Sequence, residues 1–325
     1  MSAATTDRQR VANAAPARGA VTRPRLVAGP AVSRTTVTPK PPAAESGLSR
    51  KTVRNRLVAD LRALGVQQAR PLLVHASLSH IGHVRGGAET VIDALLEVLG
   101  PDGTLVTGAG TPENSTTSRA FRMRTAGFTP DELERFCAKM PAFDRASTPT
   151  SVGAIAEALR NTPGAHRSAH PQSSFAAVGR EAKELMAGHR VSCHLGEDSP
   201  LAKLYKRDAQ ILMLGVDYRS CSAFHLAEYR YRAHPPKRVY SCVVKKRGKP
   251  RWSYYRDVVL DDGDFEIIGN YMENELKDQG LMLTGCVGRA ASRLLPMRRV
   301  VDLAGHWMGE NRPWKPTGAS KNWFW

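Results

Sequence analysis

The fold of this chain is constrained most by a strand, helix, strand pattern between residues 72 and 107. The apolar run Leu72-Leu73-Val74 is typical of a short buried strand. Apolar residues then recur with helical spacing over residues 88–99. A Gly-Pro-Asp-Gly turn at 100–103 leads into a second strand at 104–107. This order predicts a βαβ-like unit with a parallel pair of strands.

The remaining periodicity predicts a three-layer α/β/α fold with a central mixed sheet in one domain. Ser49 is a plausible N-cap for a first helix, which Gly65 ends. Strands are expected at 174–178 and 209–216, with an antiparallel pair at 239–244 and 252–259. Helices are expected at 151–160, 224–230, 265–277, 289–294 and 300–308. Residues 108–150 lack clear elements, which is more typical of a functional insertion than of a linker.

Composition indicates a soluble protein with an affinity for anions. The chain has 325 residues, of which 42% are hydrophobic, and no run reaches the roughly 18 apolar residues of a membrane span. Its net charge of +17 favours polyanions or phosphorylated cofactors as partners. The five cysteines show no CxxC spacing, so we expect no zinc site, no disulfide framework and a cytoplasmic location.

The N-terminal segment, residues 1–47, is predicted to be a disordered basic tail that precedes a catalytic domain at 48–325. It carries seven basic and two acidic residues and has no hydrophobic periodicity. A secretory signal would need a continuous apolar stretch, which this segment lacks. An organellar transit peptide remains compatible with its composition.

His170 is the first candidate for chemistry. The following Pro171 disfavours helical backbone at His170, which therefore lies on a loop just before the expected strand at 174–178. A histidine with a pKa near neutrality can take a proton from an attacking amine. A hydrogen-bonded loop histidine without a catalytic role is the alternative.

His225 and Glu228 form a second candidate group. They are three residues apart, so a helix would place both on one face, where the carboxylate could orient the imidazole or hold an amine. A solvent-facing polar pair is the alternative. Cys221 precedes His225 by four residues, and a Cys–His nucleophilic pair would indicate a thiol enzyme.

The loop after the first strand is a candidate binding segment. It contains Ser77, Leu78, Ser79 and Gly82 and lies at the carboxyl end of the strand, where open α/β sheets bind ligands. Gly86-Gly87 opens the next helix, whose N-terminus would favour phosphate. Neither GxxxxGK[ST] nor GxGxxG is present, so the nucleotide-triphosphatase and Rossmann patterns lack their marker.

Several ordered motifs together resemble the aminoglycoside 3-N-acetyltransferases. They are LLVHASLSHIGHVRGGAETVIDALLEVLGPDGTLV, HPQSSFAAVG, GEDSPLAKLY and ILMLGVDYRSCSAFHLAEYR, followed by VGRAASRLLPMRRVVDLAGHWM. The resemblance spans about residues 50 to 310. The chain departs from the family's pattern at Ser220–Phe224, where an Asn-Thr-Ser-Leu type of sequence is expected, and at Gly305-His306-Trp307.

The resemblance implies an α/β/α enzyme that binds acetyl-coenzyme A and an amine together and transfers the acetyl group directly. It implies that His170 is the general base, that Glu228 lies near the amine with His225 beside it, and that the Ser77-Leu78-Ser79 segment approaches coenzyme A. No metal is implied. A homodimer is possible.

Three alternatives remain open at this point. The acceptor could be a non-aminoglycoside amine of a biosynthetic pathway, although the acidic residues Asp261, Asp262, Asp264 and Glu266 could attract a polycation. A nucleic-acid-binding protein would use the basic surface, but aromatic residues make up only 6% of the chain and no helix-turn-helix pattern is present. A thiol enzyme would use Cys221.

Overall fold

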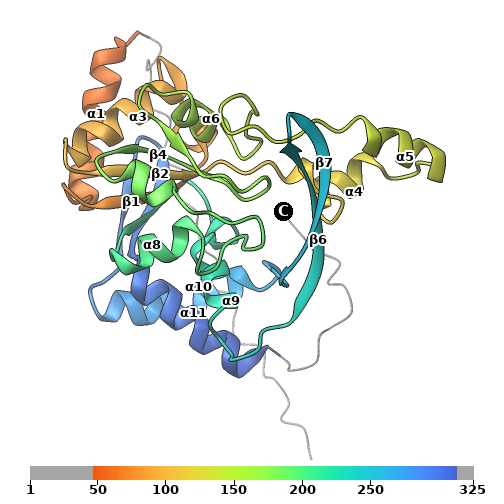
Figure 1. Ribbon diagram of the computed structural model, residues 1–325. Coiled ribbons are helices and arrows are strands. Elements are labelled where there is room, and N and C mark those ends of the chain that lie inside the picture. Colours follow the sequence, from red (N-terminus) through yellow and green to blue (C-terminus); the bar gives the residue numbers. More distant parts are fainter. Residues whose placement is uncertain (1–46, 313–325) are drawn as a thin grey trace, which may run out of the picture. The chain divides into compact units, whose positions relative to one another are not determined.

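The computed structural model describes residues 47–312, and a seven-stranded mixed sheet is their central element (Figure 1). The strands run in the order β3-β4-β2-β1-β5-β9-β8. The central strand, β1 (Pro71–Ala76), pairs in parallel with β2 (Thr104–Gly108) and with β5 (Gln210–Leu214). The other pairings are antiparallel, and they involve β3 (His166–Arg167), β4 (Phe175–Gly179), β8 (Leu283–Val287) and β9 (Ala290–Pro296). The predicted parallel pair and mixed sheet are therefore confirmed.

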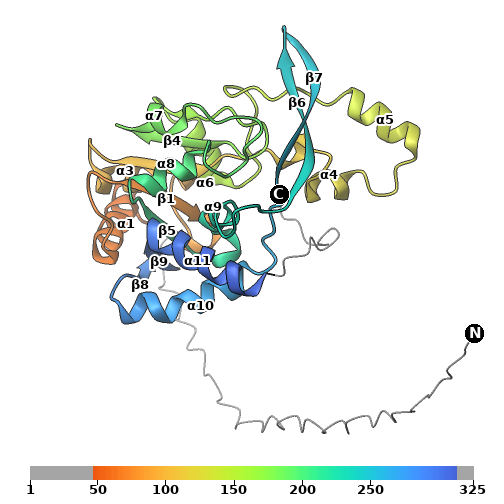
Figure 2. The ribbon, with the colours of Figure 1, turned by 60° about the horizontal axis from the view of Figure 1, so that its bottom comes forward.

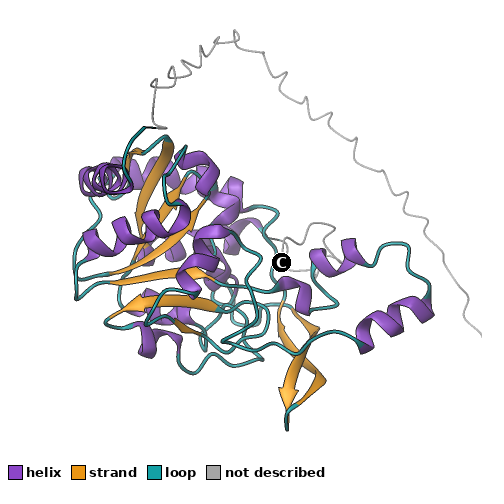
Figure 3. Ribbon diagram, turned by 90° about the horizontal axis from the view of Figure 1, so that it is seen from above, coloured by secondary structure: helices purple, strands orange, loops and turns teal. Residues whose placement is uncertain are grey.

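The sheet separates two hydrophobic cores because successive strand residues point to opposite faces. Leu72 and Val74 of β1 belong to one core, whereas Leu73 belongs to the other. The first core is covered by α1 (Arg50–Leu64), α3 (Gly87–Leu99) and α6 (Ala154–Arg160). The second is covered by α7 (Ala182–Met186), α8 (Pro200–Lys206), α9 (Ala223–Glu228), α10 (Phe265–Asp278) and α11 (Met297–Asn311). Figure 3 shows the helices on both sides of the strands, which confirms the predicted three-layer α/β/α fold.

The ends of the first helix follow from the expected capping residues. The hydroxyl of Ser49 accepts the backbone N–H of Thr52 at 3.1 Å, and Gly65 ends the helix with a left-handed φ of 96°. Such a φ favours glycine, which has no Cβ to clash with the backbone.

The helix predicted at 289–294 is wrong, because this segment is the strand β9. Ala290, Ser292 and Leu294 are buried in alternation, and the strand pairs with β5 and β8. The pairing of this segment with neighbouring strands thus decides the structure, because the local apolar pattern fits both a helix and a strand. The preceding β8 was not predicted, and Gly288, with a φ of 57°, forms the tight turn between the two strands.

The insertion at 108–150 lies beside a two-stranded ribbon formed by β6 (Lys237–Lys246) and β7 (Lys249–Val258) (Figure 2). It contains α4 (Arg119–Arg124) and α5 (Pro130–Ala138). Phe121 and Met140 of the insertion pack against Val243 of the ribbon. The Asn114 side chain also binds both backbone groups of Val243, at 2.6 and 3.1 Å. The predicted antiparallel pair is confirmed.

Some predictions concern parts of the chain that the structure describes only in part. The predicted tail, residues 1–47, lies outside the described residues except for Gly47. Within residues 47–312, no helix combines the length and the apolar character needed to cross a bilayer. All five cysteines are free thiols.

Candidate functional site

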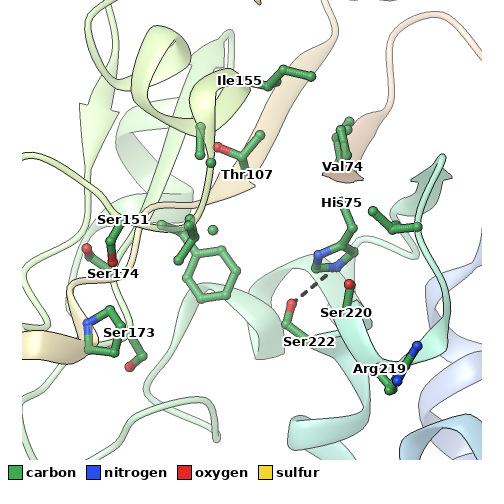
Figure 4. A pocket seen from close by; sticks show the side chains of 18 of the residues that line it. Val74, His75, Thr107, Ser151, Ile155, Ser173, Ser174, Arg219, Ser220 and Ser222 are labelled. Atoms are coloured by element: carbon green, nitrogen blue, oxygen red, sulfur yellow. Dashed lines mark hydrogen bonds between the residues drawn. The ribbon is translucent and has the colours of Figure 1, made fainter. Parts of the chain in front are cut away.

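A pocket of about 530 Å³ lies at the carboxyl ends of the parallel strands (Figure 4). This is the edge at which open α/β sheets bind ligands. The ends of β1 and β2, the start of β4, the N-terminal turn of α6 and the loop between β5 and α9 contribute to its wall. The residues that line it include His75, Thr107, Ser173, Leu195, Ser222 and Asp262. The topology therefore brings together segments that lie far apart in the sequence.

His75 lies in this pocket at the end of β1. Its Nε2 lies 3.3 Å from the Ser222 hydroxyl, as the dashed line in Figure 4 marks. Burial, and then the electrostatic interaction with His225, lower the pKa of His75 to about 4. The ring is therefore neutral at physiological pH. The sequence contains a signal for this residue, because His75 directly follows the apolar run Leu72-Leu73-Val74 of the expected buried strand.

Helix α9 places His225 and Glu228 in direct contact. Nδ1–H of His225 donates to Oε2 of Glu228 at 2.7 Å, and both side chains are buried. Oε1 of Glu228 accepts the backbone N–H of Asp261 at 2.7 Å and pairs with the guanidinium of Arg312 at 2.6 Å. The contact with Glu228 fixes the orientation of the His225 ring. The predicted shared helix face thus carries a buried dyad.

Asp262 is one of two acidic residues that line the pocket, the other being Asp217. It is 5% exposed, and its Oδ1 has no hydrogen-bond partner among residues 47–312. Burial raises its pKa to about 6, while the electrostatic interaction with His225 acts in the opposite direction. The acidic residues near Asp262 in the sequence do not all face the pocket. Asp264 pairs with Arg312 and does not line the pocket.

His170 is fully buried and does not line the pocket. Its Nδ1 accepts the backbone N–H groups of Gln172 and Ser173, each at 3.1 Å, and its Nε2–H donates to the carbonyl of Val191 at 3.1 Å. Burial, followed by the charges of His194 and His189, lowers the pKa of His170 well below its usual range. In this arrangement His170 shapes the loop that brings Ser173 to the pocket wall.

The predicted binding loop adjoins the pocket, whose wall reaches Ala76. Ser77 caps the short helix α2 (Leu78–Ile81), its backbone N–H donates to the carbonyl of Leu214, and its hydroxyl lies 3.0 Å from that of Ser79. Leu78 lines a separate surface groove beside α3 and α6. Gly82 has a φ of 101°, and a side chain there would meet Arg289, so glycine is needed for the turn.

Cys221 is not an activated nucleophile in this structure. It is fully buried beside the start of α9, and burial raises the pKa of its thiol to about 12. A thiol with such a pKa carries almost no thiolate at neutral pH, and the thiolate is the reactive form. Within the described part of the chain, no cluster of His, Cys, Asp and Glu could hold a metal ion.

Comparison with known proteins links this site to one family. The model of the family described as aminoglycoside 3-N-acetyltransferase matches residues 73–309. The prophage-derived aminoglycoside N(3′)-acetyltransferase-like protein YokD of Bacillus subtilis is 35% identical, over 78% of this chain and 92% of its own length. Aminoglycoside N(3)-acetyltransferase VII of Streptomyces paromomycinus is also 35% identical, over 79% of this chain and 91% of its own length.

Solved structures agree with these relatives. The crystal structure of YokD superposes with a TM-score of 0.74 at 34% identity, covering 79% of this chain and 93% of that chain. AAC-IIIb in a binary complex with CoASH gives 0.67 at 27% identity, over 78% and 95% of the two chains. AAC-VIa bound to sisomicin superposes with a TM-score of 0.67 at 29% identity, covering 78% of this chain and 96% of that chain.

Proposed function

Because the chain belongs to the aminoglycoside 3-N-acetyltransferase family, we propose that it transfers the acetyl group of acetyl-coenzyme A to an amino group of an aminoglycoside. The observation that carries this proposal is the pocket at the strand ends, in which a buried carboxylate, Asp262, lies in the electrostatic field of the His225–Glu228 dyad. Transfer is direct, in a complex that holds both substrates, because the buried Cys221 thiol offers no nucleophile for a covalent intermediate.

The dyad supports a role for His225 as the general base. An amine that is protonated at neutral pH cannot attack a thioester, so a proton must leave first. Because Glu228 accepts the Nδ1–H of His225, Nε2 is the basic nitrogen of the ring. His225 takes the first proton, and the amine nitrogen then bonds to the thioester carbonyl carbon. The C–S bond breaks, coenzyme A leaves as the thiolate, and the thiolate takes up the second proton that the nitrogen loses. His225 returns its proton to solvent.

Asp262 supports recognition of a cationic acceptor. An ammonium group beside the unpartnered Oδ1 would give this buried carboxylate the counter-charge that it lacks among the described residues. The raised pKa of Asp262 shows that its charge is costly in the free protein. Binding of a cation should therefore lower that pKa and stabilise the ionised form.

His170 remains a predicted catalytic residue, but its hydrogen bonds favour a positioning role. Nδ1 accepts from two backbone N–H groups, so proton uptake there would require the loop at 172–173 to move. We therefore assign proton transfer to His225 and the shaping of the loop to His170. The two assignments predict different effects of substitution.

We place acetyl-coenzyme A in the pocket at the strand ends, with its phosphates toward the loop that contains Ser77, Leu78, Ser79 and Gly82. A volume of about 530 Å³ is within the range of small-molecule sites. A cytoplasmic location fits the five free cysteines, since coenzyme A and reduced thiols share that compartment. The homodimer, and the division into a tail at 1–47 and a domain at 48–325, stay predictions.

An acceptor panel tests the proposed function. The full chain is incubated with acetyl-coenzyme A and either sisomicin, simple polyamines or amino sugars, and thiol release is measured with product mass. We expect release with sisomicin and a mass increase of one acetyl group. Activity on the other amines with none on sisomicin would instead support a biosynthetic N-acyltransferase. Absence of thiol release with every amine would contradict the transferase proposal.

A further inference from the structure

A second, smaller cavity adjoins the pocket, and we propose that it receives the methyl group of the acetyl donor and so restricts the enzyme to short acyl groups. This inference rests on the proposed function. The cavity measures about 30 Å³ and shares Pro112, Ser173 and Leu195 with the larger pocket. The shared wall places it as a side chamber of the site in which we place the thioester.

The polar side chains around this cavity already have hydrogen-bond partners. His194 contacts Asp257 through Nδ1 at 2.8 Å and Gln172 through Nε2 at 2.7 Å. The Ser173 hydroxyl donates to the carbonyl of His194 at 2.8 Å. The Tyr240 hydroxyl donates to the carbonyl of Val258 at 2.9 Å. A wall whose polar atoms are occupied favours an apolar occupant over water, which needs two or more polar partners.

The volume excludes the other reactant from the cavity. About 30 Å³ accommodates roughly one water molecule or one methyl group, so a sugar ring cannot enter. The guanidinium of Arg238 also lines the wall, and its charge disfavours a cationic amine. The methyl group of an acetyl thioester meets both conditions, since it is small and uncharged.

The cavity is also close to the groups that we assign to catalysis. Leu260, one of its apolar walls, precedes Asp262 by two residues. Burial lowers the pKa of His194, and the contact with Asp257 opposes this shift. The electrostatic interaction with His225 lowers the pKa further, so His194 lies in the field of the dyad. During transfer the new N–C bond replaces the C–S bond, and the alkyl part of the acyl group does not react. Its size is therefore limited by the wall around it.

Leu195 and Leu260 are the residues that we expect to set this limit. Both are buried in the same hydrophobic core, and both line the small cavity. Truncation of either side chain to alanine should lengthen the cavity enough for one or two more methylene groups. A third leucine of that core, Leu185 on α7, is equally buried but lines neither cavity, which makes Leu185→Ala a matched control.

The test compares kcat/KM for acetyl-, propionyl- and butyryl-coenzyme A with one acceptor. One methylene in an apolar pocket changes specificity by about 10- to 200-fold, so the unmodified enzyme should use propionyl-coenzyme A at least ~10-fold less well than acetyl-coenzyme A. Butyryl-coenzyme A should be poorer still. In Leu260→Ala and Leu195→Ala the propionyl-to-acetyl ratio should rise by about 10-fold, whereas Leu185→Ala should leave it unchanged.

Equal use of acetyl- and butyryl-coenzyme A by the unmodified enzyme would overturn the inference without any variant. An unchanged ratio in both cavity variants, with the acceptor KM raised instead, would also overturn it and assign the cavity to the acceptor. If Leu260→Ala does not fold, Leu195→Ala and the unmodified enzyme still decide. Failure to use any of the three thioesters would contradict the proposed function itself, which separates the two failures.

Discussion

His225 and His170 are both buried histidines near one pocket, but they are held by different kinds of partner. His225 donates Nδ1–H to the carboxylate of Glu228 at 2.7 Å, and an arginine neutralises that carboxylate. His170 accepts two backbone N–H groups at Nδ1 and donates Nε2–H to a backbone carbonyl. One ring is thus oriented by a charge, the other by the main chain.

The difference supports our proposal that His225, and not His170, transfers the proton. A carboxylate on Nδ1 stabilises the imidazolium that forms when Nε2 takes up a proton. Two N–H donors aimed at Nδ1 oppose a proton at that nitrogen, because three hydrogen atoms would then converge on one side of the ring. Burial among other histidines lowers the pKa of His170 further. The comparison therefore supports our proposals that His225 is the base and that His170 fixes a loop.

The largest expected effect is that of His225→Ala. Loss of a general base lowers turnover by about 10² to 10⁴-fold, and we expect about 10³-fold here. Affinity for coenzyme A should change little, because the proton that the base removes belongs to the amine and not to coenzyme A. Steady-state rates and the dissociation constant of coenzyme A, measured on the same preparation, test both expectations. Near-normal turnover in a folded His225→Ala protein would break the comparison.

His170→Ala should act mainly on stability. Two buried N–H groups and one carbonyl would lose their partner, at about 1–3 kcal/mol for each unsatisfied group, partly offset by water entering the space. Turnover should fall less than in His225→Ala, because only the loop that carries Ser173 is loosened. Urea unfolding beside steady-state kinetics gives both quantities. A loss of 10² to 10⁴-fold in turnover with unchanged stability would instead identify His170 as the base.

The pH dependence of that stability loss sharpens the comparison. His170 has a lowered pKa in the folded protein, so below about pH 6.5 the unfolded chain takes up a proton that the folded chain does not. The unmodified protein therefore loses up to about 1.4 kcal/mol per pH unit from this group as the pH falls through that range. The difference between the unmodified protein and His170→Ala should narrow from pH 8 to pH 5.

Asp262→Asn should affect stability and activity in opposite directions. The pKa of Asp262 is about 6 in the folded protein, against 3.8 for an ordinary aspartate, so its ionisation destabilises the fold progressively between about pH 4 and pH 6. Above pH 6 the cost is constant at about 3 kcal/mol, and the amide removes it. Thermal unfolding at pH 8 and pH 4 should show stabilisation only at pH 8. Acceptor KM should rise at the same time.

An unchanged acceptor KM in Asp262→Asn would remove this residue from substrate recognition. Equal stabilisation at both pH values would show that the effect comes from packing of the amide and not from the charge. Asp302 offers a control position. It is an exposed carboxylate that accepts a hydrogen bond from Tyr205 on α8. Asp302→Asn should leave both the acceptor KM and the pH dependence of stability unchanged.

The sequence predicts the elements that local pattern determines and misses those that tertiary contacts determine. The strand at 72–74 and the capped first helix follow from apolar runs and from Ser49 and Gly65. The segment at 290–296 could not be assigned reliably, because its pairing with β5 and β8 decides between helix and strand. The dyad was accessible through the i, i+3 spacing of His225 and Glu228.

Other parts of the site were not accessible in this way. The sequence does not distinguish the aspartates at 261, 262 and 264 from one another. In the structure the backbone of Asp261 binds Glu228, and Asp264 pairs with Arg312. Of the three, only Asp262 lines the pocket. His170 drew attention because a histidine before a proline lies on a loop. The hydrogen bonds of His170 could not be predicted in this way. Val191 is distant in the sequence, and the backbone N–H groups of Gln172 and Ser173 point to the ring only in the folded loop.

Cys221→Ala is expected to have the smallest effect and sets the lower end of the comparison. Cys221 begins the same turn that positions His225, so a catalytic thiol there would give His225 a different role, that of a base for the cysteine. Burial and a pKa of about 12 leave the thiol protonated at neutral pH. Alanine is smaller by one sulfur atom, which should cost about 1 kcal/mol of stability and no more than about twofold in turnover. Loss of turnover by 10²-fold or more in the folded variant would contradict this expectation and point to a covalent acyl-cysteine intermediate. Such an intermediate would release a burst of thiol when the unmodified enzyme is mixed rapidly with acetyl-coenzyme A alone. We expect no burst.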